Sequence, residues 1–281
     1  MTRMAVAPAP MTAIDLAEVL EFLGARETQS MFLTAKLLGQ GQAMDAWLAR
    51  DSGRIAGVFG RTEGGIILPQ WPGGDWNAAA RPLAGGTVEG LIGTAEQVAA
   101  LRPALGLVAA PTRQDGAEPG YRLDLPILRL PDCSGFALSP IDDLATVGGW
   151  RAACESELFA ASPAEARAKA PAKVARWQSA YSHRVLWHLG QPVALTGFNA
   201  RLPEVAQVGG VLVPPALRGR GHARRAVGLH LAEARGHGLR RAVLFAASIA
   251  AARAYEALGV QPAGVIGLIL FPPGQCVSPC P

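Results

Sequence analysis

The strongest constraint on the fold is an order of helical and strand patterns that occurs twice along the chain. The first half opens with apolar residues at helical spacing from Leu16 to Leu23 and a second apolar run at 30–41 with Ser30 as its N-cap, and its last helical pattern covers 94–105. The second half opens with two helical patterns, at 142–159 and 163–181. The β-rich runs between them cover 54–61, 65–71 and 87–93 in the first half and 183–190, 192–200 and 206–214 in the second. This order of helix, helix, strand, strand, strand, helix predicts a tandem repeat of one α/β unit.

The second half continues beyond the repeat, with a strand pattern at 241–247, a helix at 250–258 and a final strand at 265–271. The stretch APTRQDGAEPGY at 110–121 collects turn formers and charges, which predicts a linker or long loop. A length of 281 residues favours two domains. We place them at 1–131 and 132–273, followed by a loose C-terminal tail at 274–281.

Composition excludes several classes of protein. Half of the residues are apolar, so disorder is not expected, and the net charge of +4 comes without a run of basic residues that would form a nucleic-acid arm. An anionic small ligand explains the basic excess equally well. The four cysteines form no C-x-x-C pair and no cluster with zinc spacing, so no metal site is predicted. No apolar stretch reaches signal-peptide or membrane-span length, so we expect a cytoplasmic protein without a membrane partner.

The stretch LRGRGHARRAV at 217–227 lies between a strand pattern and a helical pattern and is typical of an anion cradle. The first N–H groups of a helix are unpaired, and the helix dipole adds positive charge there. Gly219 and Gly221 allow the backbone to approach a phosphate group without a Cβ in the way. The surrounding arginines can pair with further phosphate oxygens, and they are Arg218, Arg220, Arg224 and Arg225.

The six residues Arg218-Gly219-Arg220-Gly221-His222-Ala223 resemble the R/Q-x-x-G-x-G/A signature of the GCN5-related N-acetyltransferase (GNAT) family. The context resembles the family too: 208–227 is similar to its fourth strand, loop and third helix, and 241–260 to its fifth strand and next helix with a Tyr-x-x-x-Gly ending. The resemblance covers about 134–271. It implies two GNAT-like domains, each a mixed, mostly antiparallel central sheet flanked by helices, with 1–131 a degenerate copy that lacks the cofactor loop.

The resemblance also implies roles for individual residues. The loop from Arg218 to Ala223, with Arg224, would hold the diphosphate of coenzyme A, and the strand through Val211 and Val213 would offer backbone groups to the pantetheine arm. Tyr255 matches the tyrosine that gives a proton to the departing thiolate, a role that suits a phenol close to the sulfur. The cofactor-binding residues are therefore Val211, Val213, Arg218, Gly219, Arg220, Gly221, His222, Ala223 and Arg224.

Two positions depart from the family. Ser248 stands where members often have an asparagine, seven residues before the tyrosine, and it can still form a hydrogen bond. Gln207 stands in the part of the fourth strand where several members have a glutamate as general base, and glutamine does not accept a proton usefully. We name Glu157 as the candidate that faces the acceptor cleft, so the candidate catalytic residues are Tyr255, Glu157 and Ser248. The base otherwise falls to Glu204, Glu155, His183 or a chain of waters.

These observations predict an acyl-CoA-dependent N-acyltransferase that transfers acetyl from acetyl-CoA to a primary amine of a small molecule or peptide by direct attack. No metal and no nucleic-acid partner is expected, no cysteine is expected at the site of a covalent intermediate, and a homodimer is left open. Two alternatives remain. The first is a non-catalytic module that binds acyl-CoA for sensing or assembly, which Gln207 and Ser248 favour. The second is an aminoacyl-transferase that uses charged tRNA, against which the intact loop argues.

Overall fold

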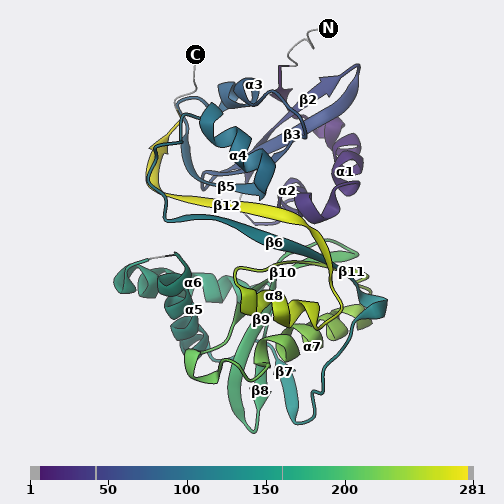
Figure 1. Cartoon of the computed structure of the whole chain (residues 1–281), viewed down its shortest axis with the longest axis vertical. Coiled ribbons are helices and arrows are strands. Elements are labelled where there is room, and N and C mark those ends of the chain that lie inside the picture. Colours follow the sequence, from purple (N-terminus) through teal and green to yellow (C-terminus); the bar gives the residue numbers. More distant parts are fainter. Residues whose placement is uncertain (1–6, 42, 160, 278–281) are drawn as a thin grey trace. The chain divides into compact units, whose positions relative to one another are not determined.

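The structure is a computed structural model that describes residues 7–41, 43–159 and 161–277. It divides into two compact units, Met1–Glu118 with Gly264–Pro281, and Pro119–Ala263. This division differs from the boundaries expected at 131/132 and 273/274, because the segment from Gly264 onwards belongs to the first unit. Each unit is built on a mixed, mostly antiparallel sheet that is flanked by helices, as predicted (Figure 1).

The described strands of the first unit follow the order β1-β2-β3-β4-β5-β12. All neighbours pair antiparallel except β4 and β5, which pair parallel. The strands are β1 (Ala9–Pro10), β2 (Met44–Asp51), β3 (Arg54–Thr62), β4 (Ile66–Gln70), β5 (Thr87–Thr94) and β12 (Gln261–Cys276), and the helices are α1 (Leu16–Gly24), α2 (Glu27–Leu37), α3 (Trp76–Ala80) and α4 (Ala95–Ala104).

The second unit repeats this design in the order β6-β11-β10-β9-β8-β7, and its parallel pair is β10 with β11. Its strands are β6 (Gln114–Asp124), β7 (Phe136–Ser139), β8 (His183–His188), β9 (Gln191–Arg201), β10 (Val205–Leu212) and β11 (Arg241–Phe245). Its helices are α5 (Leu144–Phe159), α6 (Pro163–Ser179), α7 (His222–Gly236) and α8 (Ile249–Glu256).

Alternation along the strands builds a core on each face of the second unit's sheet. Val185 packs in a cluster with residues of α5 and α6, whereas its neighbour Leu186 packs in a cluster with Ala226 of α7. The start of α6 is fixed locally, because Ser162 and Glu165 form a capping box. Because Val185 and Leu186 point to opposite faces, α5 and α6 cover one face of this sheet and α7 covers the other.

The first unit holds three elements that the sequence patterns did not predict, β1, β2 and α3. In β2, Met44, Trp47 and Leu48 are spaced as on a helix, yet Leu48 packs in one core cluster and Trp47 against another. The β-rich runs of the first half therefore correspond to β3, β4 and β5, whereas those of the second half correspond to β8, β9 and β10. Matched by pairing, β2, β3 and β4 are the counterparts of β8, β9 and β10.

Two segments expected to be irregular form strands. The linker expected at 110–121 contains most of β6, whose residues Gly120–Asp124 pair antiparallel with β11. The tail expected from 274 begins inside β12, because Gln275 and Cys276 pair with β5; residues 278–281 lie outside the described residues. Both ladders join segments more than a hundred positions apart, which a local pattern does not reveal.

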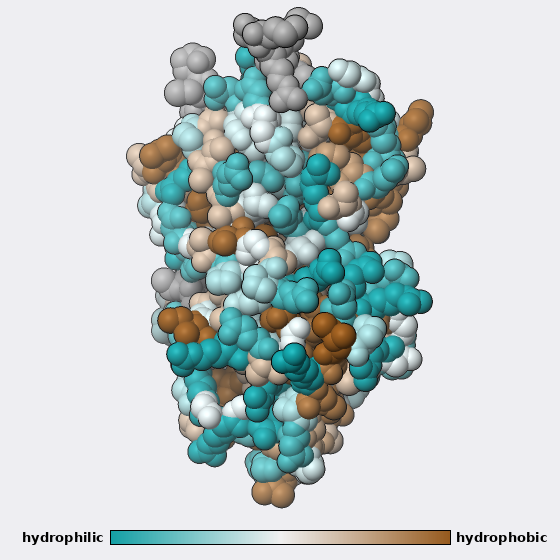
Figure 2. All heavy atoms as spheres, turned by 45° about the vertical axis from the view of Figure 1, so that its right-hand side comes forward, coloured by the Kyte–Doolittle hydropathy of each residue, from teal (hydrophilic) through white to brown (hydrophobic). Residues whose placement is uncertain are grey.

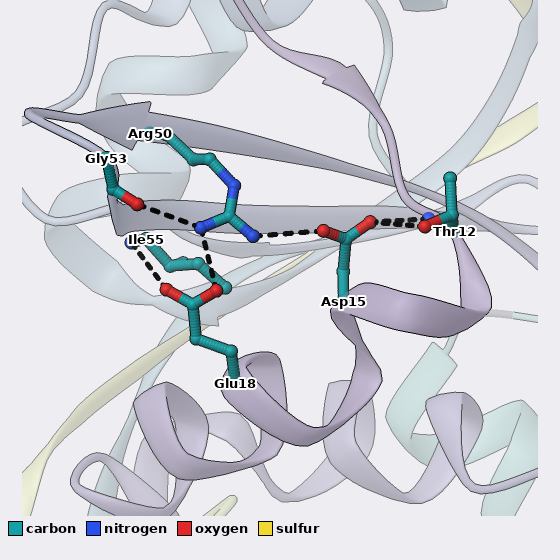
Figure 3. Close-up of polar contacts among 6 residues, drawn as sticks. All are labelled: Thr12, Asp15, Glu18, Arg50, Gly53 and Ile55. Carbon is teal, nitrogen blue, oxygen red and sulfur yellow. Dashed lines mark hydrogen bonds and ion pairs between the residues drawn. The ribbon is translucent and has the colours of Figure 1, made fainter.

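A polar network in the first unit fastens the start of α1 to the hairpin of β2 and β3 (Figure 3). The guanidinium of Arg50 pairs with Asp15 at 2.9 Å and Glu18 at 2.7 Å and donates to the carbonyl oxygen of Gly53 at 3.0 Å. The Asp15 carboxylate also accepts hydrogen bonds from Thr12, and these contacts lower its pKa. The network orders this corner of the unit.

The surface is mixed in character. On the face drawn in Figure 2, hydrophobic residues lie in small groups among hydrophilic ones, outside the residues drawn in grey. Within the described part of the chain, no helix is both long and apolar enough to cross a membrane.

Candidate cofactor and active site

A cleft of about 780 Å³ lies entirely within the second unit. Its walls come from α5 and α8, and the end of β10, the following loop and the first turn of α7 complete it. The lining includes eleven of the twelve predicted site residues: Val211, Val213, Arg218, Gly219, Gly221, His222, Ala223, Arg224, Glu157, Ser248 and Tyr255. The exception is Arg220, which is exposed and is not among the lining residues.

The loop before α7 has the backbone geometry of an anion cradle. Gly219 and Gly221 both adopt the left-handed conformation, with φ of 76° and 75°. An added Cβ at Gly219 would meet no heavy atom within 4 Å, so the space in front of it is open. Gly221 is the N-cap of α7, and neither a side-chain cap nor an acidic residue lies in the first turn. The first N–H groups of α7 are therefore available to an anion.

Two arginines of the cleft differ in their contacts. The Nε atom of Arg224 is buried and has no hydrogen-bond partner among the described residues. The guanidinium of Arg218, by contrast, forms a two-pronged ion pair with Glu157 on α5. A buried cationic donor without a partner is costly, so the Nε of Arg224 is unsatisfied within the described residues. These residues fit the diphosphate of a coenzyme A thioester.

Arg225 lies behind the loop. Its Nε donates to the carbonyl oxygen of Asp132 at 2.8 Å, its Nη1 donates to that of Arg220 at 3.0 Å, and its guanidinium carbon lies 4.8 Å from the ring centroid of Phe136. His222, the first residue of α7, is buried near the same ring, and burial lowers its pKa. Arg225 therefore supports the loop, and its pairing with phosphate stays a prediction.

Tyr255 and Ser248 occupy the α8 wall. Tyr255 is only 5% exposed and packs in the core cluster beneath α7 and α8, while part of it reaches the cleft. Ser248 is the N-cap of α8, and its hydroxyl oxygen accepts a hydrogen bond from the N–H of Ala251 at 3.1 Å. Its principal role in the structure is thus to begin α8, and its hydroxyl hydrogen remains a donor at the cleft.

Strand β10 separates from β11 where it enters the cleft. Their parallel pairing runs from Val205 and Arg241 to Val208 and Leu244, while β10 continues to Leu212. The pairing of β10 with β9 shifts register between Gly209 and Leu212, a bulge in which Gly210 has a φ of 63°. Val211, which lies within this irregular stretch, lines the cleft.

The residues considered as general base have other partners, either in ion pairs or in the core. Glu155 pairs with Arg151 and Lys173, and Glu204 pairs with Arg240 and Arg241. His183 is buried against the ring of Trp177, and burial lowers its pKa to about 3. The contact with Arg218 lowers the pKa of Glu157, which makes that carboxylate a weaker base.

The buried amide of Gln207 donates to the carbonyl oxygen of Val208. Its Oε1 atom has no partner among the described residues. The amide therefore offers an unused acceptor but no proton-accepting base.

Sequence reasoning missed Cys154, which lines the cleft from α5. That no cysteine stands at the site of a covalent intermediate stays a prediction. Cys154 is 8% exposed, and burial raises the pKa of its thiol, which favours the neutral thiol over the nucleophilic thiolate. Its position one helical turn before Glu157 was the available signal. Among the described residues, no group of three or more His, Cys, Asp or Glu side chains is placed to hold a metal ion.

The corresponding place in the first unit is closed by its own side chains. After β4, the carboxylate of Asp75 accepts a hydrogen bond from the N–H of Ala78 at 3.0 Å and caps the five-residue helix α3. Trp71 is 4% exposed and stacks against Phe59 at 6.3 Å. A carboxylate at the helix start repels a phosphate group, so this unit has the fold of the second without its cradle.

Comparison with known proteins identifies the family that this unit resembles. Residues 150–260, which lie within the second unit, match the model of the Acetyltransferase (GNAT) family. The resemblance predicted from the sequence is therefore confirmed over these residues, and the family fold supports an acyl-CoA-dependent N-acyltransferase in general.

Solved structures resemble the whole chain. A tandem GNAT protein from the clavulanic acid biosynthesis pathway is 17% identical with a TM-score of 0.55, and the match covers 96% of this chain and 99% of that one. A GCN5-related N-acetyltransferase from Sphaerobacter thermophilus is 15% identical with a TM-score of 0.56 and full coverage of both chains. A Drosophila protein is 14% identical with a TM-score of 0.62, over 95% and 99%. These likenesses show the fold of both units, and no curated protein matches the chain.

Proposed function

We propose that the protein transfers acetyl from acetyl-CoA to a primary amine of a small molecule or peptide. The observation that carries the proposal is the single cleft in which the diphosphate-type loop and Tyr255 occur together. The loop offers unpaired N–H groups and the partnerless Nε of Arg224, and Tyr255 of α8 lines the same cleft. When bound, acetyl-CoA supplies a thioester carbonyl that an amine attacks directly.

The residues of the cleft divide the work. The loop from Arg218 to Ala223 and Arg224 bind the diphosphate, and the backbone at Val211 and Val213 positions the pantetheine arm. The Tyr255 hydroxyl gives its proton to sulfur as the carbon–sulfur bond breaks. The proton that the attacking amine loses then restores the neutral hydroxyl of Tyr255. Because Glu157 is held by Arg218 and Gln207 has no carboxylate, the proposal assigns that second transfer to water.

The test is turnover of acetyl-CoA with a panel of primary amines, followed by calorimetry with coenzyme A. We expect acetylated product and one coenzyme A bound per chain, because Asp75 and Trp71 close the counterpart in the first unit. Two molecules per chain would contradict the assignment of the loop as the binding site. Cytoplasmic location and a homodimer stay predictions.

One observation favours a second candidate, a non-catalytic module that binds acyl-CoA. Among the carboxylates considered as base, Glu155, Glu157 and Glu204 are all paired with cations. A protein that binds coenzyme A with one site per chain but gives no product with any amine of the panel would support this candidate over the enzyme.

A further inference from the structure

An ion pair between Glu157 on α5 and Arg218 on the loop before α7 lies in the lining of the cleft. In this ion pair, Nη1 of Arg218 lies 2.7 Å from Oε1 of Glu157 and Nη2 lies 2.6 Å from Oε2. The Nε of Arg218 donates to the carbonyl oxygen of Val213 at 3.1 Å, which fixes the direction of the guanidinium. Both residues line the cleft, one from α5 and one from the loop before α7.

This geometry uses the part of the arginine that would bind a phosphate. A guanidinium presents two parallel N–H groups to a carboxylate or to a phosphate in the same two-pronged manner. The carboxylate of Glu157 therefore stands in the position of an anionic ligand on Arg218. Arg224 is different, because its buried Nε has no hydrogen-bond partner among the described residues.

The pair is weak enough to be exchanged. The side chains of Arg218 and Glu157 are 49% and 47% exposed, and exposed ion pairs contribute little because water and salt screen them. A diphosphate carries more negative charge than one carboxylate, so it competes well for the same guanidinium. A ligand without phosphate has no anionic group that can bind Arg218, so the ion pair with Glu157 stays in place.

We propose that Glu157 is a specificity-determining residue that competes with the co-substrate's diphosphate for Arg218. This inference rests on the proposed function. Binding of the co-substrate exchanges Arg218 from carboxylate to phosphate and releases the Glu157 carboxylate from the loop. The competition lowers the affinity for every anion at this site, and a diphosphate overcomes it better than a simple anion does.

The test compares coenzyme A with pantetheine, which lacks the phosphates, by calorimetry on the full chain. We expect Glu157→Gln to raise the affinity for coenzyme A by about twofold to fivefold, the range that an exposed ion pair contributes. The affinity for pantetheine stays unchanged. Glu21→Gln removes the same charge from an exposed position of α1 and serves as the matched control, with no change for either ligand.

Two arginine variants make the test specific. Arg218→Ala and Arg224→Ala both weaken binding of coenzyme A, but only in the Arg218→Ala background does Glu157→Gln lose its effect. Unchanged or weaker binding of coenzyme A by Glu157→Gln overturns the inference, and so does an equal gain for pantetheine. If the unaltered protein binds no coenzyme A, the proposed function itself is wrong, which is a different result.

Discussion

The Nη1 atom of Arg225 donates a hydrogen bond to the backbone carbonyl oxygen of Arg220 at 3.0 Å, so the helix after the loop holds the loop in place. Arg225 is fixed in turn by the carbonyl oxygen of Asp132 and by the ring of Phe136. The left-handed turn between Gly219 and Gly221 is therefore ordered from the side away from the cleft.

Loss of this contact weakens cofactor binding without removing any group from the cleft. We expect Arg225→Ala to raise the dissociation constant for coenzyme A by about fivefold, since the ligand must then order the loop at a cost of about 1 kcal/mol. Calorimetry measures it. Arg167→Ala removes an exposed arginine from α6 and leaves the constant unchanged. Equal binding by the two variants would show that the loop needs no support.

Two glycines with the same backbone conformation separate strain from function. Gly219 and Gly190 have φ of 76° and 73°, and an added Cβ meets no heavy atom within 4 Å at either. We expect Gly219→Asp and Gly190→Asp each to lower the free energy of unfolding by about 1 kcal/mol. Only Gly219→Asp places a negative charge in the cradle, and it weakens coenzyme A binding by about tenfold or more. Denaturant titration and calorimetry report the two quantities; similar losses of affinity in both variants would place the phosphates elsewhere.

The phenol of Tyr255 acts in the transition state if it protonates the sulfur. Tyr255→Phe keeps the buried ring and removes the hydroxyl, so we expect kcat to fall by roughly 10²- to 10⁴-fold while the affinity for acetyl-CoA changes little. The measurement needs an amine that the unaltered protein acetylates, under conditions where chemistry limits the rate. A kcat equal to that of the unaltered protein removes Tyr255 from the mechanism.

Buried histidines make the stability of the fold sensitive to acid. His230 stacks against Phe198 at 4.1 Å; burial, with Arg184 adding to it and Glu233 opposing it, lowers its pKa to about 4. The folded state thus binds fewer protons than the unfolded state, in which the histidine pKa is about 6.5. The free energy of unfolding therefore falls as the pH drops from 6.5 towards 4. At pH 5 the loss is about 2 kcal/mol.

Thermal unfolding between pH 7.5 and 4.5 measures this loss. We expect His230→Gln to reduce the dependence of Tm on pH, whatever its effect on Tm at neutral pH. His237→Gln changes an exposed histidine just after α7 and keeps the full dependence. Parallel curves for the unaltered protein and His230→Gln would contradict a role for this buried ring.

The sequence predicted what depends on neighbouring residues and missed what depends on distant ones. The loop at 218–223 is readable because a glycine pair, arginines and a helix start follow each other directly. Strand β6 was taken for a linker because its partner, β11, is supplied by residues 241–245. The pairing of Glu157 with Arg218 spans 61 positions and could not be foreseen from either motif. The position of Cys154 was missed for the same reason, because its helix, α5, lines the cleft together with a loop that lies far along the chain.

The pairing of β12 with β5 has a consequence for the order of events during synthesis. The first unit needs Gly264–Pro281 as part of its compact body, although its other segment ends at Glu118. The ribosome therefore releases the first helices and strands long before their last sheet neighbour exists, and until then β5 presents an unpaired edge. Expressing the two halves of the chain separately would leave the first half without β12. The second half would then carry β12 without its partner β5. The sheet of the first unit is thus complete only in a chain that has been translated through β12.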